Sequence, residues 1–270
     1  MGPPARGLST DSGTNGLGQD GGWSSDGTDW HGGGIWINDA SPTITGNVIT
    51  ANNSTLGGGI YSYGSRAAPT VTHNVFLANT ATSQGGAMML FENDGAVVNN
   101  IFDSNVAYAA GALEIASSGD LQLINNTFVF NEATGESYNG AHIELNSDGD
   151  EVIENNIFAY GVGAAAIGAS SNAHVANCNY NDFYDNDDGA VSNTTACTAG
   201  SNTASDPVFT SRSTGDYTLQ SSSGCIDAGD PDSVYNDTDG SRNDLGAFGG
   251  LDGACYRERS PVTGCISRSI

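Results

Sequence analysis

One short pattern recurs along most of this chain and limits its possible folds more than any other feature. An asparagine is followed two positions later by a hydrophobic residue and, in most copies, by a second asparagine five positions after the first. The leading asparagines are Asn47, Asn74, Asn100, Asn126, Asn156 and Asn181. Their spacings are 27, 26, 26, 30 and 25 residues. Such regular spacing indicates a structure built by stacking one repeated unit.

The residues between these copies predict short strands. A glycine followed by Gly or Ala opens a run in which apolar residues alternate, as in Met88/Leu90 and Leu113/Ile115, the period of a strand. Another short strand, such as Thr70–Thr72, precedes each asparagine. About three strands per repeat and no helical pattern predict an all-β fold: a right-handed parallel β-helix of about six to seven coils with terminal caps.

Stacked coils place equivalent residues above one another, about 4.8 Å apart. We therefore expect the asparagines to hydrogen-bond from coil to coil, and the hydrophobic residues of the pattern to form an interior column. The members of that column are Ile49, Phe76, Phe102, Phe128, Phe158 and Phe183.

Changes in composition along the sequence divide it into three segments. Residues 32–205 carry the coils. Residues 1–31 are expected to be an N-terminal cap or a partly disordered segment anchored by Trp23 and Trp30. Residues 206–270 are Asp-rich and are expected to cap the other end, because an open strand edge must be covered to prevent end-to-end pairing.

The glycine pairs and the Phe-x-x-Asn copies, such as Phe76–Asn79 and Phe102–Asn105, resemble the repeat of polymorphic outer-membrane proteins. The resemblance spans roughly residues 32–190 and implies a surface-displayed β-helical passenger domain that acts as an adhesin. The membrane barrel of that family has no counterpart in this sequence. Pectate-lyase-like enzymes share the architecture, so the repeat defines the fold better than the function.

The net charge of the chain limits the classes of partner that it can bind. The chain has 7 Lys and Arg residues against 31 Asp and Glu residues, a net charge of −24, and all its basic residues are arginines. This excess repels nucleic acids and anionic membranes and favours calcium. No apolar run approaches the roughly 20 residues that span a bilayer, so direct membrane insertion is not expected. The missing lysine also argues against a lyase that needs a basic catalytic residue.

Five cysteines favour an oxidising compartment. The expected disulfides are Cys178–Cys197 and Cys255–Cys265, which leaves Cys225 unpaired. The alternative is that all five are reduced. The first thirty residues contain no hydrophobic segment of a secretory signal, but composition and cysteines together predict an extracellular or cell-surface protein.

Aligning the coils by their asparagines predicts a candidate site. Glu114 and Glu144 fall on neighbouring strands and point outward, and an outward column of Trp36, Tyr61 and Met89 leads to them. His142 lies beside this column. An aromatic strip that ends in two carboxyl groups suits a sugar-binding groove, and carboxyl groups about 5 to 5.5 Å apart suit a retaining glycosidase. The alternative is a solvated pair of like charges.

The C-terminal segment contains a candidate metal site. Asp237 and Asp239, followed by Gly240 and then Asp244, resemble half of a calcium-binding loop, although the closing glutamate of an EF-hand is missing. The alternative is that these side chains cap turns and that Arg242 neutralises them.

Two functions follow from these features. The first is a secreted or cell-surface module that binds a polysaccharide, a cell-surface glycan or a protein. The second is a polysaccharide-degrading enzyme, a hydrolase rather than a lyase, in which Glu114 and Glu144 are catalytic.

Overall fold

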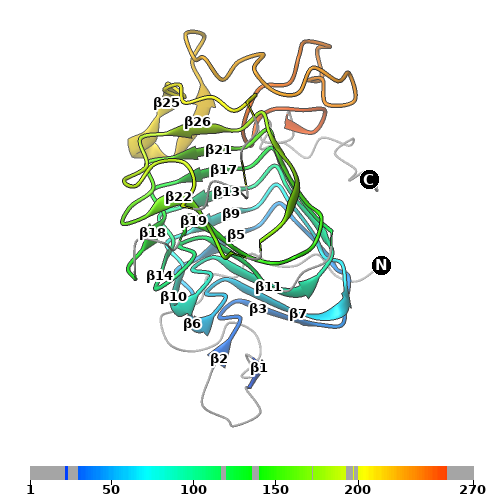
Figure 1. Ribbon diagram of the computed structural model, residues 1–270, viewed down its shortest axis with the longest axis vertical. Coiled ribbons are helices and arrows are strands. Elements are labelled where there is room, and N and C mark those ends of the chain that lie inside the picture. Colours follow the sequence, from blue (N-terminus) through cyan, green and yellow to red (C-terminus); the bar gives the residue numbers. More distant parts are fainter. Residues whose placement is uncertain are drawn as a thin grey trace.

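The computed structural model describes residues 22–23, 30–116, 120–135, 140–171, 173–192, 197 and 200–253. The chain winds into the expected right-handed parallel β-helix, whose coils stack from the N-terminal end at the bottom of Figure 1 to the C-terminal end at the top. Four six-stranded sheets run along its length. Among the described residues, no helix is long and apolar enough to cross a membrane.

Sheet 1 follows the glycine pairs, sheet 2 precedes the leading asparagines and sheet 3 contains the hydrophobic column. Sheet 1 consists of β3 (Ile35–Asn38), β7 (Ile60–Ala67), β11 (Met88–Asn93), β15 (Leu113–Ala116), β19 (Gly140–Asn146) and β22 (Ala165–Ala169). Sheet 2 consists of β4 (Thr43–Thr45), β8 (Thr70–Thr72), β12 (Gly95–Val98), β16 (Leu121–Ile124), β20 (Glu151–Glu154) and β23 (Val175–Asn179). Sheet 3 consists of β5 (Val48–Thr50), β9 (Val75–Leu77), β13 (Ile101–Asp103), β17 (Thr127–Val129), β21 (Ile157–Ala159) and β24 (Asp182–Tyr184).

A fourth sheet was not expected, because the sequence indicated about three strands per repeat. It consists of β1 (Gly22–Trp23), β2 (Trp30–His31), β6 (Asn53–Leu56), β10 (Thr80–Gln84), β14 (Val106–Ala107) and β18 (Glu132–Ala133). Its parallel strands fall between the second asparagine and the next glycine pair. They are short and rich in Ser, Thr and Ala, so they lack the apolar alternation that reveals a strand.

The interior column forms as predicted. The rings of Phe76, Phe102, Phe128, Phe158 and Phe183 stack with centroids 4.7, 4.5, 4.9 and 5.2 Å apart. Residues such as Leu90 and Ile115 of sheet 1 fill the rest of the lumen and are fully buried. The solenoid therefore has one continuous hydrophobic core.

The leading asparagines form the expected ladder between sheets 2 and 3. Each backbone N–H donates to the side-chain oxygen of the next rung, for example from Asn74 to Asn100 at 2.9 Å, and Asn202 adds a rung after Asn181. The residue before each of the six leading asparagines has a positive φ, including non-glycine residues such as His73 (57°) and Asn99 (52°). The ladder offsets the cost of this strained turn by satisfying buried backbone groups.

The C-terminal segment, for which we predicted a capping role, packs against the outer face of sheet 3. It contains the antiparallel pair β25 (Phe209–Ser211) and β26 (Asp216–Leu219), joined by the 3₁₀ turn η1 (Arg212–Thr214). Phe209, Tyr217 and Leu245 form a second core with apolar residues of sheet 3.

Candidate functional site

The predicted outward column exists on sheet 1. Trp36, Tyr61, Met89, Glu114 and Glu144 are register partners on five successive strands, β3, β7, β11, β15 and β19. Their neighbours along each strand point into the lumen, so the alternation that placed these side chains outside the coil is confirmed.

The two carboxyl groups are nevertheless buried, so the idea of a solvated pair is wrong. Glu114 is 0% exposed and Glu144 is 6% exposed. Tyr61 and Met89 are also buried and form a small cluster on the outside of the sheet with Ala116. Of the column, only Trp36 presents a large exposed area, at 45%.

The two glutamates differ in how their oxygens are satisfied. Glu114 Oε1 accepts hydrogen bonds from the amide groups of Asn146 at 2.8 Å and Gln84 at 3.3 Å, while its buried Oε2 has no hydrogen-bond partner among the described residues. Glu144 Oε2 accepts the backbone N–H of Gly140 at 2.7 Å. One unsatisfied carboxyl oxygen therefore lies inside this site.

Burial governs the protonation of the pair. It raises the pKa of Glu114 to about 8, opposed by the hydrogen bond from Asn146 and assisted by the nearby Glu144 carboxylate. It also raises the pKa of Glu144 to about 7, against the effect of the Gly140 hydrogen bond. Because two interacting carboxyls titrate as a unit, the pair retains a proton near neutral pH. Perturbed carboxyl pairs of this kind are typical of functional sites.

His142 does not lie beside this column, and that expectation is wrong. Its side chain is fully buried inside the solenoid, in a second asparagine ladder. The ladder contains Asn79, Asn105 and Asn131 in successive coils, and the coil after them has Gly161 at the equivalent position. The imidazole fills this gap: its Nδ1 lies 3.1 Å from Asn131 Nδ2 and its Nε2 lies 2.9 Å from Asn186 Oδ1.

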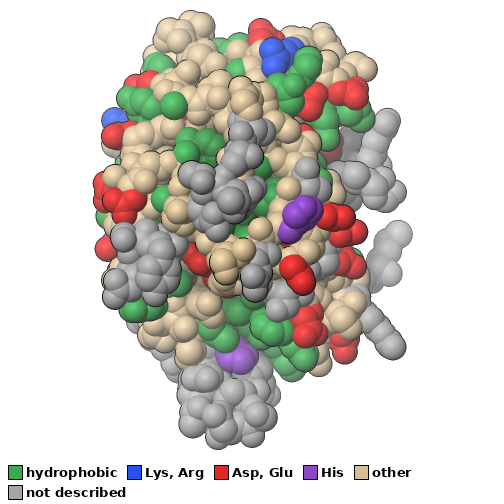
Figure 2. Space-filling view, viewed as in Figure 1, with side chains coloured by type: hydrophobic (Ala, Val, Ile, Leu, Met, Phe, Trp, Pro, Cys, Tyr) green, Lys and Arg blue, Asp and Glu red, His purple; other side chains and the backbone are tan. Residues whose placement is uncertain are grey.

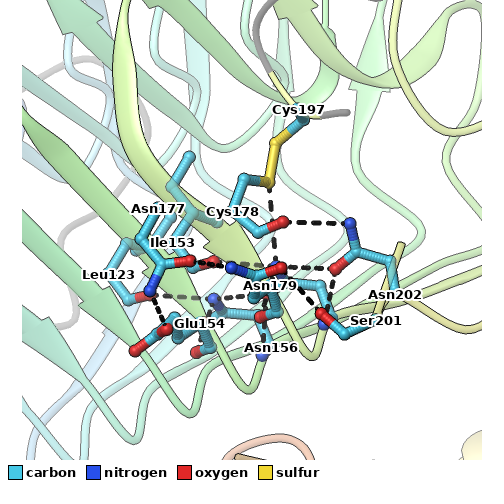
Figure 3. The surroundings of a disulfide bond; sticks show 11 residues. Leu123, Ile153, Glu154, Asn156, Asn177, Cys178, Asn179, Cys197, Ser201 and Asn202 are labelled. Atoms are coloured by element: carbon cyan, nitrogen blue, oxygen red, sulfur yellow. Dashed lines mark hydrogen bonds between the residues drawn. A yellow bond between two sulfur atoms is a disulfide. The ribbon is translucent and has the colours of Figure 1, made fainter. Parts of the chain in front are cut away.

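The disulfide between Cys178 and Cys197 is present, with a Cα–Cα distance of 5.3 Å. Figure 3 shows it next to the last rungs of the first ladder, where the Asn202 amide donates to the Cys178 carbonyl at 3.0 Å. The bond therefore fastens Cys197 to β23. Cys225 is buried and free, and the expected Cys255–Cys265 pair lies outside the described residues.

The candidate calcium loop uses its carboxylates to hold turns. Asp237 accepts backbone N–H groups from Asp244 at 3.1 Å and Gly250 at 2.5 Å. Asp239 accepts the N–H of Ser241, and Asp244 accepts that of Asp227. Burial and the neighbouring Asp244 raise the pKa of Asp237 to about 6.

These three aspartates are not gathered around one point, and no cluster of three or more His, Cys, Asp or Glu suited to a metal occurs in the described ranges. Arg242 donates to the carbonyls of Gly229 and Ala228. Calcium at this loop stays a prediction.

The sequence prediction missed two aromatic residues on the outer face of sheet 1. Tyr63 is 40% exposed, and its ring centroid lies 5.6 Å from that of Phe91 on the next strand. Both follow a residue of the predicted column by two positions, so alternation places them on the same face. Figure 2 shows hydrophobic side chains gathered over β3, β7 and β11, with acidic side chains along the right-hand edge.

Comparison with known families agrees with this architecture. Residues 24–180, more than half of the chain, match the family described as the right handed beta helix region. The chain therefore belongs to the right-handed β-helix family. No curated protein and no solved structure matches it.

Proposed function

We propose that this protein is a secreted or cell-surface binding module that holds a glycan or a partner surface against the outer face of sheet 1. One observation carries the proposal: Trp36 and Tyr63 are large aromatic residues, 45% and 40% exposed, on neighbouring strands of one flat sheet face. Exposed aromatic side chains that cluster on one face mark binding surfaces, because they bury a large apolar area when a ligand covers them.

The rigidity of the scaffold supports this role. Trp36, Tyr63 and Phe91 lie on paired strands whose inner faces are packed in the core, so the rings are held in place before a ligand arrives. A preorganised surface loses less conformational entropy on binding. The disulfide at Cys178 and Cys197 supports the secreted or cell-surface location, because such bonds persist in oxidising environments.

A direct test is affinity electrophoresis of the full chain in gels that contain a panel of neutral and charged polysaccharides. Trp36→Ala and Tyr63→Ala should each weaken retardation at least tenfold. Tyr108→Ala is the matched control, because Tyr108 is an exposed aromatic residue (51%) that follows β14 of the fourth sheet. Equal losses in all three variants, or retardation that neither sheet 1 variant changes, would contradict the proposal.

A second candidate function is polysaccharide hydrolysis by Glu114 and Glu144. It is favoured by the register pairing of the two carboxyls and by their raised pKa values. Their burial counts against it, because a hydrolase must bring both groups to the glycosidic oxygen and the anomeric carbon. Release of reducing ends that Glu114→Gln or Glu144→Gln abolishes would establish hydrolysis, while glycan binding that survives both substitutions without such release would support the binding module.

A further inference from the structure

The Glu114–Glu144 pair brings together two carboxyl groups that can both ionise only if a positive charge joins them. The two residues are register partners on β15 and β19, so their backbones lie about 4.8 Å apart. Both side chains are buried, and no group in the described part of the chain hydrogen-bonds to Glu114 Oε2. Placing two carboxylates this close in a poorly hydrated site is costly unless a positive charge joins them.

The described side chains do not supply that charge. The sequence contains no lysine. The two arginines whose side chains are described, Arg212 and Arg242, lie over the rings of Tyr160 and Tyr180 on the C-terminal side of the molecule. The groups that do reach Glu114 are neutral amides from Gln84 and Asn146.

Two amide groups reach Glu114 from the coils on either side of it. Gln84 precedes the strand of Met89, and Asn146 lies two residues beyond Glu144 on the same face of β19. Each amide can turn its oxygen toward a cation, because its two ends have similar size. The next residue in the column after Glu144 is Gly168, which puts no side chain over the carboxylate.

We propose that Glu114 and Glu144 bind one hard divalent cation, with Glu114 Oε2 and the Glu144 carboxylate as ligands and the amide oxygens of Gln84 and Asn146 completing the shell. Hard cations take carboxylate and amide oxygens in this way, and calcium tolerates the irregular geometry that two stacked strands impose. The site contains only two acidic residues, so it differs from a cluster of three or more, of which the described part of the chain has none. It is also separate from the Asp237 loop.

The test is calorimetric titration of the full chain with CaCl₂ after dialysis against chelator, together with melting curves with and without chelator. Glu114→Gln and Glu144→Gln should each reduce affinity for calcium at least tenfold and remove the effect of chelator on the Tm. Asp237→Asn is the matched control and should change neither. Absence of calcium binding in the unmodified protein, or binding lost in Asp237→Asn and kept in both glutamine variants, would overturn the proposal.

A second measurement keeps the proposal testable if the glutamine variants fail to fold. Tyr61 precedes Glu114 by two positions in the column, about 10 Å away at the spacing of strands. Terbium bound between the glutamates should therefore emit on excitation of tyrosine, and Tyr61→Phe should lower that emission at least twofold without altering the carboxyls. If Tyr61→Phe leaves the terbium emission unchanged, the ion is bound elsewhere and the proposed site is wrong.

Discussion

His142 occupies the space that Gly161 leaves in the second asparagine ladder. A Cβ atom on residue 161 would lie 2.9 Å from His142 Nε2, too close for an unstrained contact. The equivalent positions to His142 in the two preceding coils are Ala87 and Ala112, where an asparagine completes the ladder instead. This coil therefore has a histidine and a glycine where the neighbouring coils have an alanine and an asparagine, and the ladder keeps its hydrogen bonds.

Because the two positions differ together from the neighbouring coils, we predict that substitutions at His142 and Gly161 compensate each other. His142→Ala should lower the free energy of unfolding by about 2–4 kcal/mol, because it leaves a cavity and removes two hydrogen bonds. Gly161→Asn alone should also destabilise, since the new side chain collides with the imidazole. The double variant should recover most of the loss, because it restores the arrangement of the neighbouring coils. Urea denaturation of all four proteins measures this coupling, and additive losses would contradict it.

The protonation of His142 predicts acid sensitivity. Burial lowers its pKa to about 4, against the opposing effect of the hydrogen bond to Asn186. Asn131 donates to Nδ1, so the neutral ring carries its proton on Nε2 and donates it to Asn186. A folded-state pKa below the unfolded value of 6.5 gives stability that is fully present above pH 6.5 and is lost as the pH falls to 4.

The expected loss over this range is about 3 kcal/mol, because each pKa unit corresponds to about 1.4 kcal/mol. Unfolding free energies between pH 4 and 7 should therefore fall more steeply for the natural protein than for the His142→Ala/Gly161→Asn variant. Other titrating groups are common to both proteins and cancel in the comparison. Parallel curves would show that His142 is not the group responsible.

The first asparagine ladder predicts that an alanine substitution costs more stability at a buried rung than at the half-buried first rung. Asn100 is fully buried, accepts the backbone N–H of Asn74 and donates to the carbonyls of Val71 and Val98. Asn100→Ala should cost about 2–4 kcal/mol, because buried groups lose their partners. Asn47→Ala makes the same change at the half-buried first rung and should cost less than about 1 kcal/mol. Similar melting temperatures for the two variants would refute this dependence.

The disulfide predicts a redox effect on stability. Cys178 and Cys197 are separated by 19 residues, a loop whose closure contributes about 3 kcal/mol in the chain-entropy description. Dithiothreitol should therefore lower the Tm of the natural protein and of Cys225→Ala, which keeps the bond. The Cys178→Ala/Cys197→Ala variant should respond less, because only the expected Cys255–Cys265 bond is left for the reductant to break. A Tm that does not respond to reductant in the natural protein would contradict this expectation.

The sequence predicted those features that the repeat determines. Once the asparagines are aligned, the register of sheets 2 and 3 follows, so the phenylalanine stack could be derived. The glycine pairs set the register of sheet 1 from Trp36 to Glu114, and the 30-residue spacing that relates Asn126 to Asn156 also relates Glu114 to Glu144. The burial of Glu114 could not be derived, because its carboxyl group is contacted by the amide groups of Gln84 and Asn146 from other coils. These residues occupy different positions of the repeat, so no periodicity links them.

His142 was misplaced for a related reason. It lies two residues before Glu144, so simple alternation places both on the same face, but the register of β19 against β22 shifts between Gly140 and Ile143 and interrupts the alternation there. Two signals were present in the sequence: a large residue at a position where Ala87 and Ala112 are small, and Gly161 where an asparagine was due. Only the two signals together show that the histidine takes the place of the missing asparagine.

The contacts of the C-terminal segment affect the order in which the parts of the protein can fold during synthesis. Its backbone bonds to the turn residues of four coils in succession, Asn155, Asn125, Asn99 and His73. A solenoid normally gains stability coil by coil, because each repeat touches only its neighbours. Here a segment that follows the coils in the chain joins coils made before it, so the side of the rod stays uncovered until that segment has been synthesised, and the coils then lose their independence.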